Sequence, residues 1–168
     1  MNKLKRYLII KIIFVILIGT LSHFIYDWSG QSFILGFFFP VSESTWEHMK
    51  LIFFPMLICT CFVPNTLKDS YPCITSAMLL ATILGTLLIP VLFYTYSGIL
   101  GKNYAPLDIA VYVISVILAF GIVYRDTLSC KSAPYKYWIE ILVFVLFIFF
   151  LLFTYSPPNI GIFIDPQS

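Results

Sequence analysis

Five long apolar stretches most constrain what this chain can fold into. They lie near Tyr7–Asp27, Glu43–Val63, Pro72–Tyr94, Leu107–Tyr124 and Tyr137–Tyr155. A transmembrane helix needs roughly 20 mainly apolar residues to cross a hydrocarbon core of about 30 Å. Of the 168 residues only 11% are charged, whereas soluble domains carry about a quarter. We therefore predict one integral membrane domain over residues 1–168: an all-α, polytopic transmembrane helical bundle of about five spans, multi-pass in the cell membrane.

The distribution of lysine and arginine predicts the orientation of this bundle. If the N-terminus lies inside, the cytoplasmic segments hold Lys3, Lys5, Arg6, Lys68, Arg125, Lys131 and Lys136, and the outer segments hold Lys50 and Lys102. This bias predicts an inner N-terminus and an outer C-terminus. The first stretch resembles a secretion signal, but Ser22–Asp27 lacks a cleavage pattern, so we interpret it as a retained span.

The four cysteines fit this orientation. Cys59 and Cys61 fall in the inner half of the second stretch, and Cys73 and Cys130 fall at cytoplasmic helix ends. Disulfides are rare in that reducing compartment. The sequence therefore predicts four free thiols.

Small residues predict how the third and fourth stretches pack. Ala77, Ala81 and Gly85 recur every four residues and so share one helix face, which lets another helix approach closely. Ser115 and Ala119 offer a matching surface. We expect these residues to pack within the chain.

Two further segments are too apolar for ordinary loops and too short to span. They are Ser29–Val41 and Pro157–Ser168. Non-helical backbone at membrane depth is tolerated only where protein covers it. We predict that 29–41 is interfacial or re-entrant, and that the C-terminal tail packs beside the polar residues described next.

Residues 22–50 hold both histidines and three of the eight carboxylates. The candidate site residues are His23, Asp27, Glu43, Glu47 and His48. Ionisable groups at membrane depth are costly and usually functional, so we expect these five to converge in one outward-opening pocket. Imidazole and carboxylate ligands suit zinc, iron or manganese, which makes a divalent metal the candidate cofactor.

A second interpretation of the same window is structural. Ser44-Thr45-Trp46-Glu47 fits a capping box, in which the serine caps a helix and the glutamate reaches back to its amide. Capping would occupy Ser44 and Glu47, leaving Glu43 in interfacial water and His48 as an ordinary hydrogen-bonded side chain. Capping does not explain why His23 and Asp27 are expected at the same membrane depth as these residues.

Two segments of the first third resemble a known family. Pro40–Leu51, with its Glu-Ser-Thr-Trp-Glu-His-Met-Lys core, and His23–Gly30 are similar to small polytopic membrane proteins of Gram-positive bacteria that form a family of unknown function. The chain departs from that pattern at Ser42, where the family has Asn, and at Asp27, where it often has Glu. The resemblance implies a bacterial plasma-membrane location and no particular reaction.

Three classes of function remain open. The first is an accessory, sensing or ligand-binding membrane protein, the second a metal-assisted hydrolase or transferase acting on a lipid or isoprenoid, and the third a small ion- or proton-coupled transporter. No His-Glu-x-x-His motif supports the enzyme, and no inverted repeat supports the transporter. A net charge of +2 without a basic patch excludes nucleic acid as a partner, and the lack of a glycine-rich phosphate loop excludes nucleotides. Membrane lipids are the partners expected, and the oligomeric state stays open.

Overall fold

The computed structural model describes residues 3–165 and is all-α over that range, as predicted. Its α-helices are α1 (Lys3–Trp28), α2 (Phe33–Gly36), α3 (Thr45–Cys61), α4 (Asn65–Ser70), α5 (Ile74–Leu100), α6 (Ala105–Ser129) and α7 (Lys136–Tyr155). Short 3-10 turns at Ala133–Tyr135 and Gly161–Phe163 flank α7.

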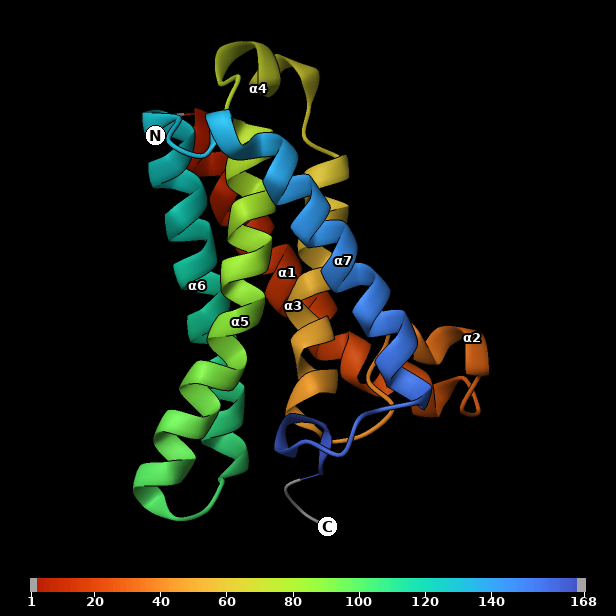
Figure 1. The fold of residues 1–168 in the computed structure, drawn as a ribbon. Helices are drawn as coiled ribbons and strands as arrows, with labels where there is room; N and C mark the ends of the chain where they lie inside the picture. Colours follow the sequence, from red (N-terminus) through yellow and green to blue (C-terminus); the bar gives the residue numbers. More distant parts are fainter. Residues whose placement is uncertain (1–2, 166–168) are drawn as a thin grey trace.

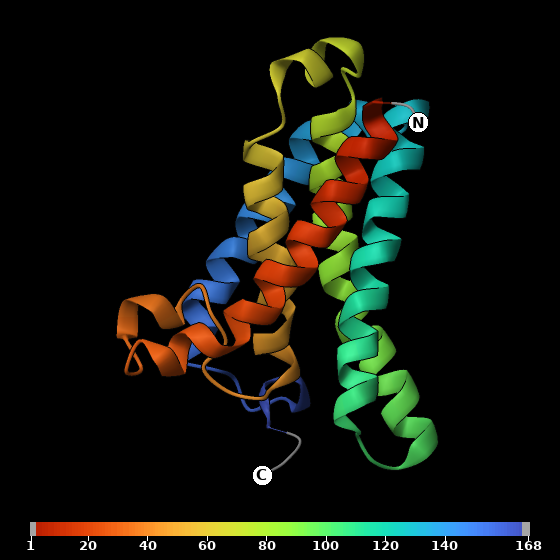
Figure 2. The same cartoon turned by 180° about the vertical axis from the view of Figure 1, so that it is seen from behind.

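The five long helices form a bundle in which consecutive long helices run in opposite directions (Figure 1). The upper end in this view holds the start of α1 and is covered by α4. The lower end holds the end of α1, the start of α3 and the end of α7, with α2 projecting beside it. The view from behind shows α1 crossing in front of α3, with α5 and α6 paired beside them (Figure 2).

Helix α3 is the centre of the bundle. Most of its residues are buried, including Phe53 and Met56. It packs between α1 and α5, and the Phe53 ring lies 4.9 Å from the Phe150 ring of α7. Burial on all sides suits a helix that is apolar around most of its circumference.

Four of the five predicted spans are confirmed by length and composition. Helices α1, α5 and α6 and the segment Ala133–Tyr155 are long and apolar enough to cross a membrane. The chain is thus consistent with a multi-pass membrane protein. The fifth, α3, has 17 residues, which at 1.5 Å per residue reach about 25 Å. Its crossing therefore stays a prediction.

The small-residue faces pack against each other as expected. Ala77 and Ala81 on α5 are fully buried, as are Ser115 and Ala119 on α6. A Cβ placed on Gly85 would lie 2.8 Å from the Ala119 Cβ, closer than real Cβ atoms come. Gly85 therefore permits the close approach of α5 and α6, and the contact lies within the chain.

The segment 29–41 does not cross the bundle. It consists of turns around the four-residue helix α2 and lies beside the lower end (Figure 1). The Tyr155 hydroxyl, at the end of α7, donates to the Phe33 carbonyl at 2.8 Å. The prediction that this segment is not a span is confirmed.

The prediction of four free thiols is wrong for two of them. Cys73 and Cys130 form a disulfide, with their Cα atoms 5.4 Å apart, while Cys59 and Cys61 are free. The predicted compartment favoured free thiols, but antiparallel packing brings the start of α5 beside the end of α6. The disulfide lies at the upper end, together with the start of α1.

Candidate functional site

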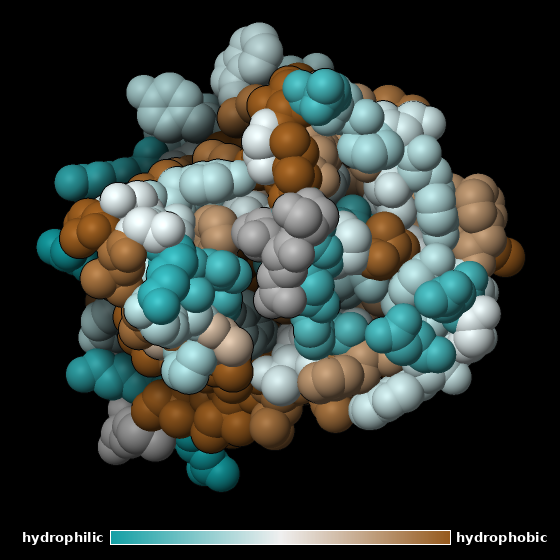
Figure 3. Space-filling model, turned by 90° about the horizontal axis from the view of Figure 1, so that it is seen from below, coloured by the Kyte–Doolittle hydropathy of each residue, from teal (hydrophilic) through white to brown (hydrophobic). Residues whose placement is uncertain are grey.

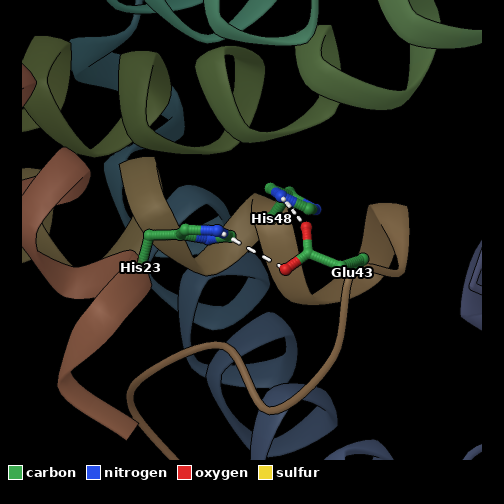
Figure 4. Close-up of side chains that lie close together, drawn as sticks. All are labelled: His23, Glu43 and His48. Atoms are coloured by element: carbon green, nitrogen blue, oxygen red, sulfur yellow. Dashed lines mark ion pairs between the residues drawn. The ribbon is translucent and has the colours of Figure 1, made fainter. Parts of the chain in front are cut away.

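Three of the five predicted site residues meet at the lower end of the bundle. His23 comes from α1, Glu43 from the loop before α3, and His48 from α3 (Figure 4). His23 Nε2 lies 3.5 Å from Glu43 Oε1, and His48 Nε2 lies 3.4 Å from Glu43 Oε2. The two imidazole rings stack with centroids 5.3 Å apart. We call these three residues the His–Glu–His cluster.

The start of α3 places two members of this cluster. Ser44 is the N-cap of α3, and its hydroxyl accepts the Glu47 N–H at 3.4 Å. Glu43 directly precedes the cap, and His48 lies one turn into the helix. His48 Nδ1 is 3.0 Å from the Ser44 carbonyl, which can only accept, so Nδ1 carries a proton and Nε2 faces Glu43.

The cluster keeps the Glu43 carboxylate ionised. The hydrogen bond from His48 holds the Glu43 pKa below its ordinary value, and the nearby positive charges of His23 and His48 act in the same direction. Burial opposes these effects and is outweighed, because Glu43 keeps 47% of its side chain exposed. A negative group thus stands between two imidazoles at neutral pH.

Glu47 is buried and points away from this cluster. Its Oε2 accepts the Val41 N–H at 3.0 Å and the Lys50 ammonium at 2.7 Å. The predicted capping box is therefore half formed: Ser44 caps the helix, but the glutamate does not return to the Ser44 amide, which instead donates to Ser42. Glu47 instead pairs with Lys50 inside the bundle. The spacing of residues in the sequence does not reveal this pairing.

Lys50 binds three segments together. Its side chain is completely buried, and its ammonium also donates to the Gly36 carbonyl at 2.9 Å and to the Thr154 hydroxyl at 2.7 Å. With the Glu47 carboxylate, these acceptors use all three ammonium protons. The sequence assigned Lys50 to the outer side and missed this role.

Asp27 also lies apart from the cluster. It is four residues after His23 and exposed near the end of α1. Among residues 3–165, only His23, Glu43 and His48 form a group of three or more candidate ligands close enough to share a metal ion. Sharing a helix face with His23 does not bring Asp27 to the cluster or to the lining of the cavity beside it.

A cavity of about 320 Å³ opens beside the cluster between α1, α3, α5 and α6. Its polar lining is Thr20, His23, Glu43, Thr45, His48, Asn103, Asp108 and Tyr112, and its apolar lining includes Phe24, Leu51, Ile89, Phe93, Ile109 and Val111. Figure 3 looks onto this lower end, where hydrophilic and hydrophobic side chains lie side by side.

Asp108 lies on the α6 side of the cavity, across from the cluster on α1 and α3. The Tyr96 hydroxyl of α5 donates to Asp108 Oδ1. Sequence reasoning missed Asp108 because an acidic residue in the first turn of a helix is common and stabilises the helix dipole. The structure shows that this helix end borders the cavity.

The C-terminal tail packs beside α3, not over the cavity. The Phe163 ring lies 4.8 Å from the Trp46 ring, and the Tyr94 hydroxyl donates to the Gly161 carbonyl at 3.1 Å. None of residues 157–165 lines the cavity. The predicted tail also included residues 166–168, which lie outside the described residues.

The cluster and the fold can be compared with known proteins. A family model, DUF6512, matches residues 1–168. The chain belongs to this family of unknown function. No curated protein and no solved structure matches it. The DUF6512 match spans the whole chain, so the helices and the cluster all lie within the family region.

Proposed function

We propose that this DUF6512 protein is an integral membrane protein that binds a divalent transition metal ion through His23, Glu43 and His48. The observation that carries the proposal is the position of the ligand atoms. One nitrogen or oxygen from each side chain lies within 4.8 Å of the other two. Two imidazoles and one carboxylate are a ligand set used by catalytic zinc and by non-haem iron.

The spacing of these atoms suits a bound ion. Atoms that bind zinc tetrahedrally at about 2.0–2.1 Å lie roughly 3.4 Å from one another. His23 Nε2 lies 3.5 Å from Glu43 Oε1, and His48 Nε2 lies 3.4 Å from the other carboxylate oxygen, Oε2. Taken as one atom from each residue, the three ligand atoms lie within 4.8 Å of one another, so the side chains would close in on a bound zinc ion, with iron and manganese as further candidates.

The surroundings of His48 support the same proposal. Metal-binding histidines usually donate their second ring N–H to a carbonyl or carboxylate, which fixes the tautomer and the ring orientation. The contact of Nδ1 with the Ser44 carbonyl provides this. When the ring loses the Nε2 proton that faces Glu43, the Nε2 lone pair becomes available to a metal ion. Within the described residues His23 Nδ1 is buried without a hydrogen-bond partner, so the stacked His48 ring and Glu43 orient the His23 ring.

The proposed ion would join α1 to the start of α3 and would keep one coordination position open to the cavity. This arrangement suits a ligand-binding, sensing or accessory membrane protein. We also propose that the N-terminus lies inside and the site faces outward. The bias of lysine and arginine towards the upper end supports this topology, whereas the Cys73–Cys130 disulfide at the same end disfavours it, because disulfides are rare in a reducing compartment.

Elemental analysis of purified, zinc-loaded protein after removal of free metal tests the proposal. We expect about one zinc per chain in the wild type. Zinc binding should weaken in each of the variants His23→Ala, Glu43→Gln and His48→Ala. The loss should exceed the 10- to 100-fold that typically follows removal of a group that only hydrogen-bonds to a metal ligand.

Asp27→Asn is the matched control, because Asp27 is an exposed carboxylate of the same window outside the cluster. It should bind zinc as the wild type does. A wild-type protein that retains no stoichiometric zinc, iron or manganese would refute the proposal, as would equal retention by all four variants.

A further inference from the structure

We infer that the cavity beside the cluster is an active site that hydrolyses a neutral acyl ester or amide of a membrane amphiphile. Asp108 is its general base. This inference rests on the proposed metal site. It adds a substrate class and a catalytic residue. The observation behind it is that Asp108 and the His–Glu–His cluster line the same cavity of about 320 Å³ from different helices.

The lining indicates an amphiphilic ligand. The cluster, Asp108 and Asn103 supply polar groups, whereas Leu51, Ile89 and Val111 supply an apolar wall. A mainly apolar pocket with a few convergent polar groups is typical of small-molecule sites. A ligand that fits both parts would place a polar group at the cluster and a hydrocarbon portion against the apolar wall.

The charges of the lining argue for a neutral substrate. None of the residues that line the cavity in the described chain is a lysine or arginine, and two of them, Glu43 and Asp108, are carboxylates. A divalent ion would be balanced by these two carboxylates, so the loaded cavity would have no net positive charge left to hold a phosphate group. An ester or amide carbonyl is neutral and can bind at the open position of a three-ligand metal ion, which polarises it.

Exposed apolar side chains lie at the edge of the cavity. Phe24 of α1 and Ile109 of α6 both line the cavity and are 45% and 65% exposed. Exposed apolar side chains on membrane helices face lipid. An amphiphile could therefore enter between α1 and α6 with its chain still in the membrane.

The proposed reaction uses water as the second substrate. A metal ion held by His23, Glu43 and His48 would polarise the substrate carbonyl. Asp108 would take a proton from a water molecule in the cavity as the water oxygen forms a bond to the acyl carbon. The bond from that carbon to the leaving oxygen or nitrogen then breaks. Asp108 returns the proton to the leaving group, so that a carboxylic acid and an alcohol or amine are released. The hydroxyl of Tyr96 holds the Asp108 carboxylate in place.

Hydroxamates of different chain length test the substrate class without any turnover. Acetohydroxamate and hexanohydroxamate would be titrated against cobalt-loaded protein in lipid nanodiscs, with the visible cobalt spectrum as the readout. We expect each methylene that enters the apolar part to tighten binding about fourfold. Hexanamide, which offers a single carbonyl oxygen in place of a chelate, is the comparison and should bind much more weakly than hexanohydroxamate.

Turnover of 4-nitrophenyl hexanoate and of hexanoyl 4-nitroanilide tests the role of Asp108. Asp108→Asn should keep the cobalt spectrum and the hexanohydroxamate affinity while kcat falls by about 100-fold or more, the usual contribution of a general base. Asp69→Asn, at an exposed position on α4 at the upper end, should behave as the wild type does.

The outcomes separate this inference from the metal proposal. If cobalt binds but chain length does not change the affinity, the inference is wrong and the metal site stands. The same holds if neither probe is hydrolysed faster than by metal-depleted protein, or if Asp108→Asn turns over at the wild-type rate. If no metal binds to the wild type, the proposed function fails first.

Discussion

The buried ion pair between Lys50 and Glu47 offers a stringent test of the packing at the lower end. The Lys50 side chain has no exposed surface, the Glu47 side chain is 3% exposed, and the two charged atoms are 2.7 Å apart. The change to make is Lys50→Met, which keeps most of the side-chain volume and removes the charge.

The expected cost follows from what the substitution leaves behind. Without Lys50, the Glu47 carboxylate stays buried with one hydrogen bond from the Val41 N–H, and the acceptors on Gly36 and Thr154 lose their donor. Removing one partner of a buried ion pair costs about 3–5 kcal/mol. Because each 1.4 kcal/mol is tenfold, the folding equilibrium should fall by two to more than three orders of magnitude.

Unfolding in mixed micelles, followed by circular dichroism during a titration with SDS, measures this cost. Lys131→Met makes the same change at an exposed position and should stay within about 0.5 kcal/mol of the wild type. The double variant Glu47→Met, Lys50→Met removes both charges and should be more stable than Lys50→Met alone. Limited proteolysis should also cut residues 29–41 faster in Lys50→Met, because the Gly36 anchor is lost.

Two results would contradict this reasoning. One is a Lys50→Met variant that loses less than about 1 kcal/mol, since the carboxylate would then have found water or another partner. The other is a double variant that loses the sum of the two single costs, since charge pairing would then contribute nothing.

Three further predictions concern pH, the disulfide and the orientation. Because the folded-state pKa of Glu43 lies below its ordinary value of 4.5, its contribution to stability is present above pH 4.5 and lost as the pH falls through the lower folded value. Unfolding of metal-free protein should therefore depend less steeply on pH below 4.5 in Glu43→Gln, and equal slopes would contradict this. Cys73 and Cys130 are 57 positions apart in the sequence, so replacing both with serine should lower stability by about 4 kcal/mol relative to the oxidised wild type. The reduced wild type is the control and should lose the same amount. In intact cells, a cysteine introduced at Ser156 on a Cys61→Ser background should react with an impermeant thiol reagent and one at Thr66 should not; the opposite pattern would invert the topology.

Local features of the sequence were sufficient to predict most of the helices of this protein. Four spans, the non-spanning segment 29–41 and the N-cap at Ser44 depend on the composition and order of neighbouring residues. The length of an apolar stretch and the presence of a capping residue are local properties, so a single sequence reveals them. The window 22–50 was also sufficient to indicate where polar side chains would gather.

Tertiary packing decided which of these side chains meet. Glu43 and Glu47 share a helical spacing, yet Glu43 joins the two imidazoles while Glu47 turns inward to Lys50. Asp108 reaches the cavity only because α6 packs beside α1. Cys73 and Cys130 likewise pair across 57 residues because α5 and α6 are antiparallel. Such contacts depend on how helices distant in sequence approach and rotate, and the spacing of residues along the chain does not contain that information.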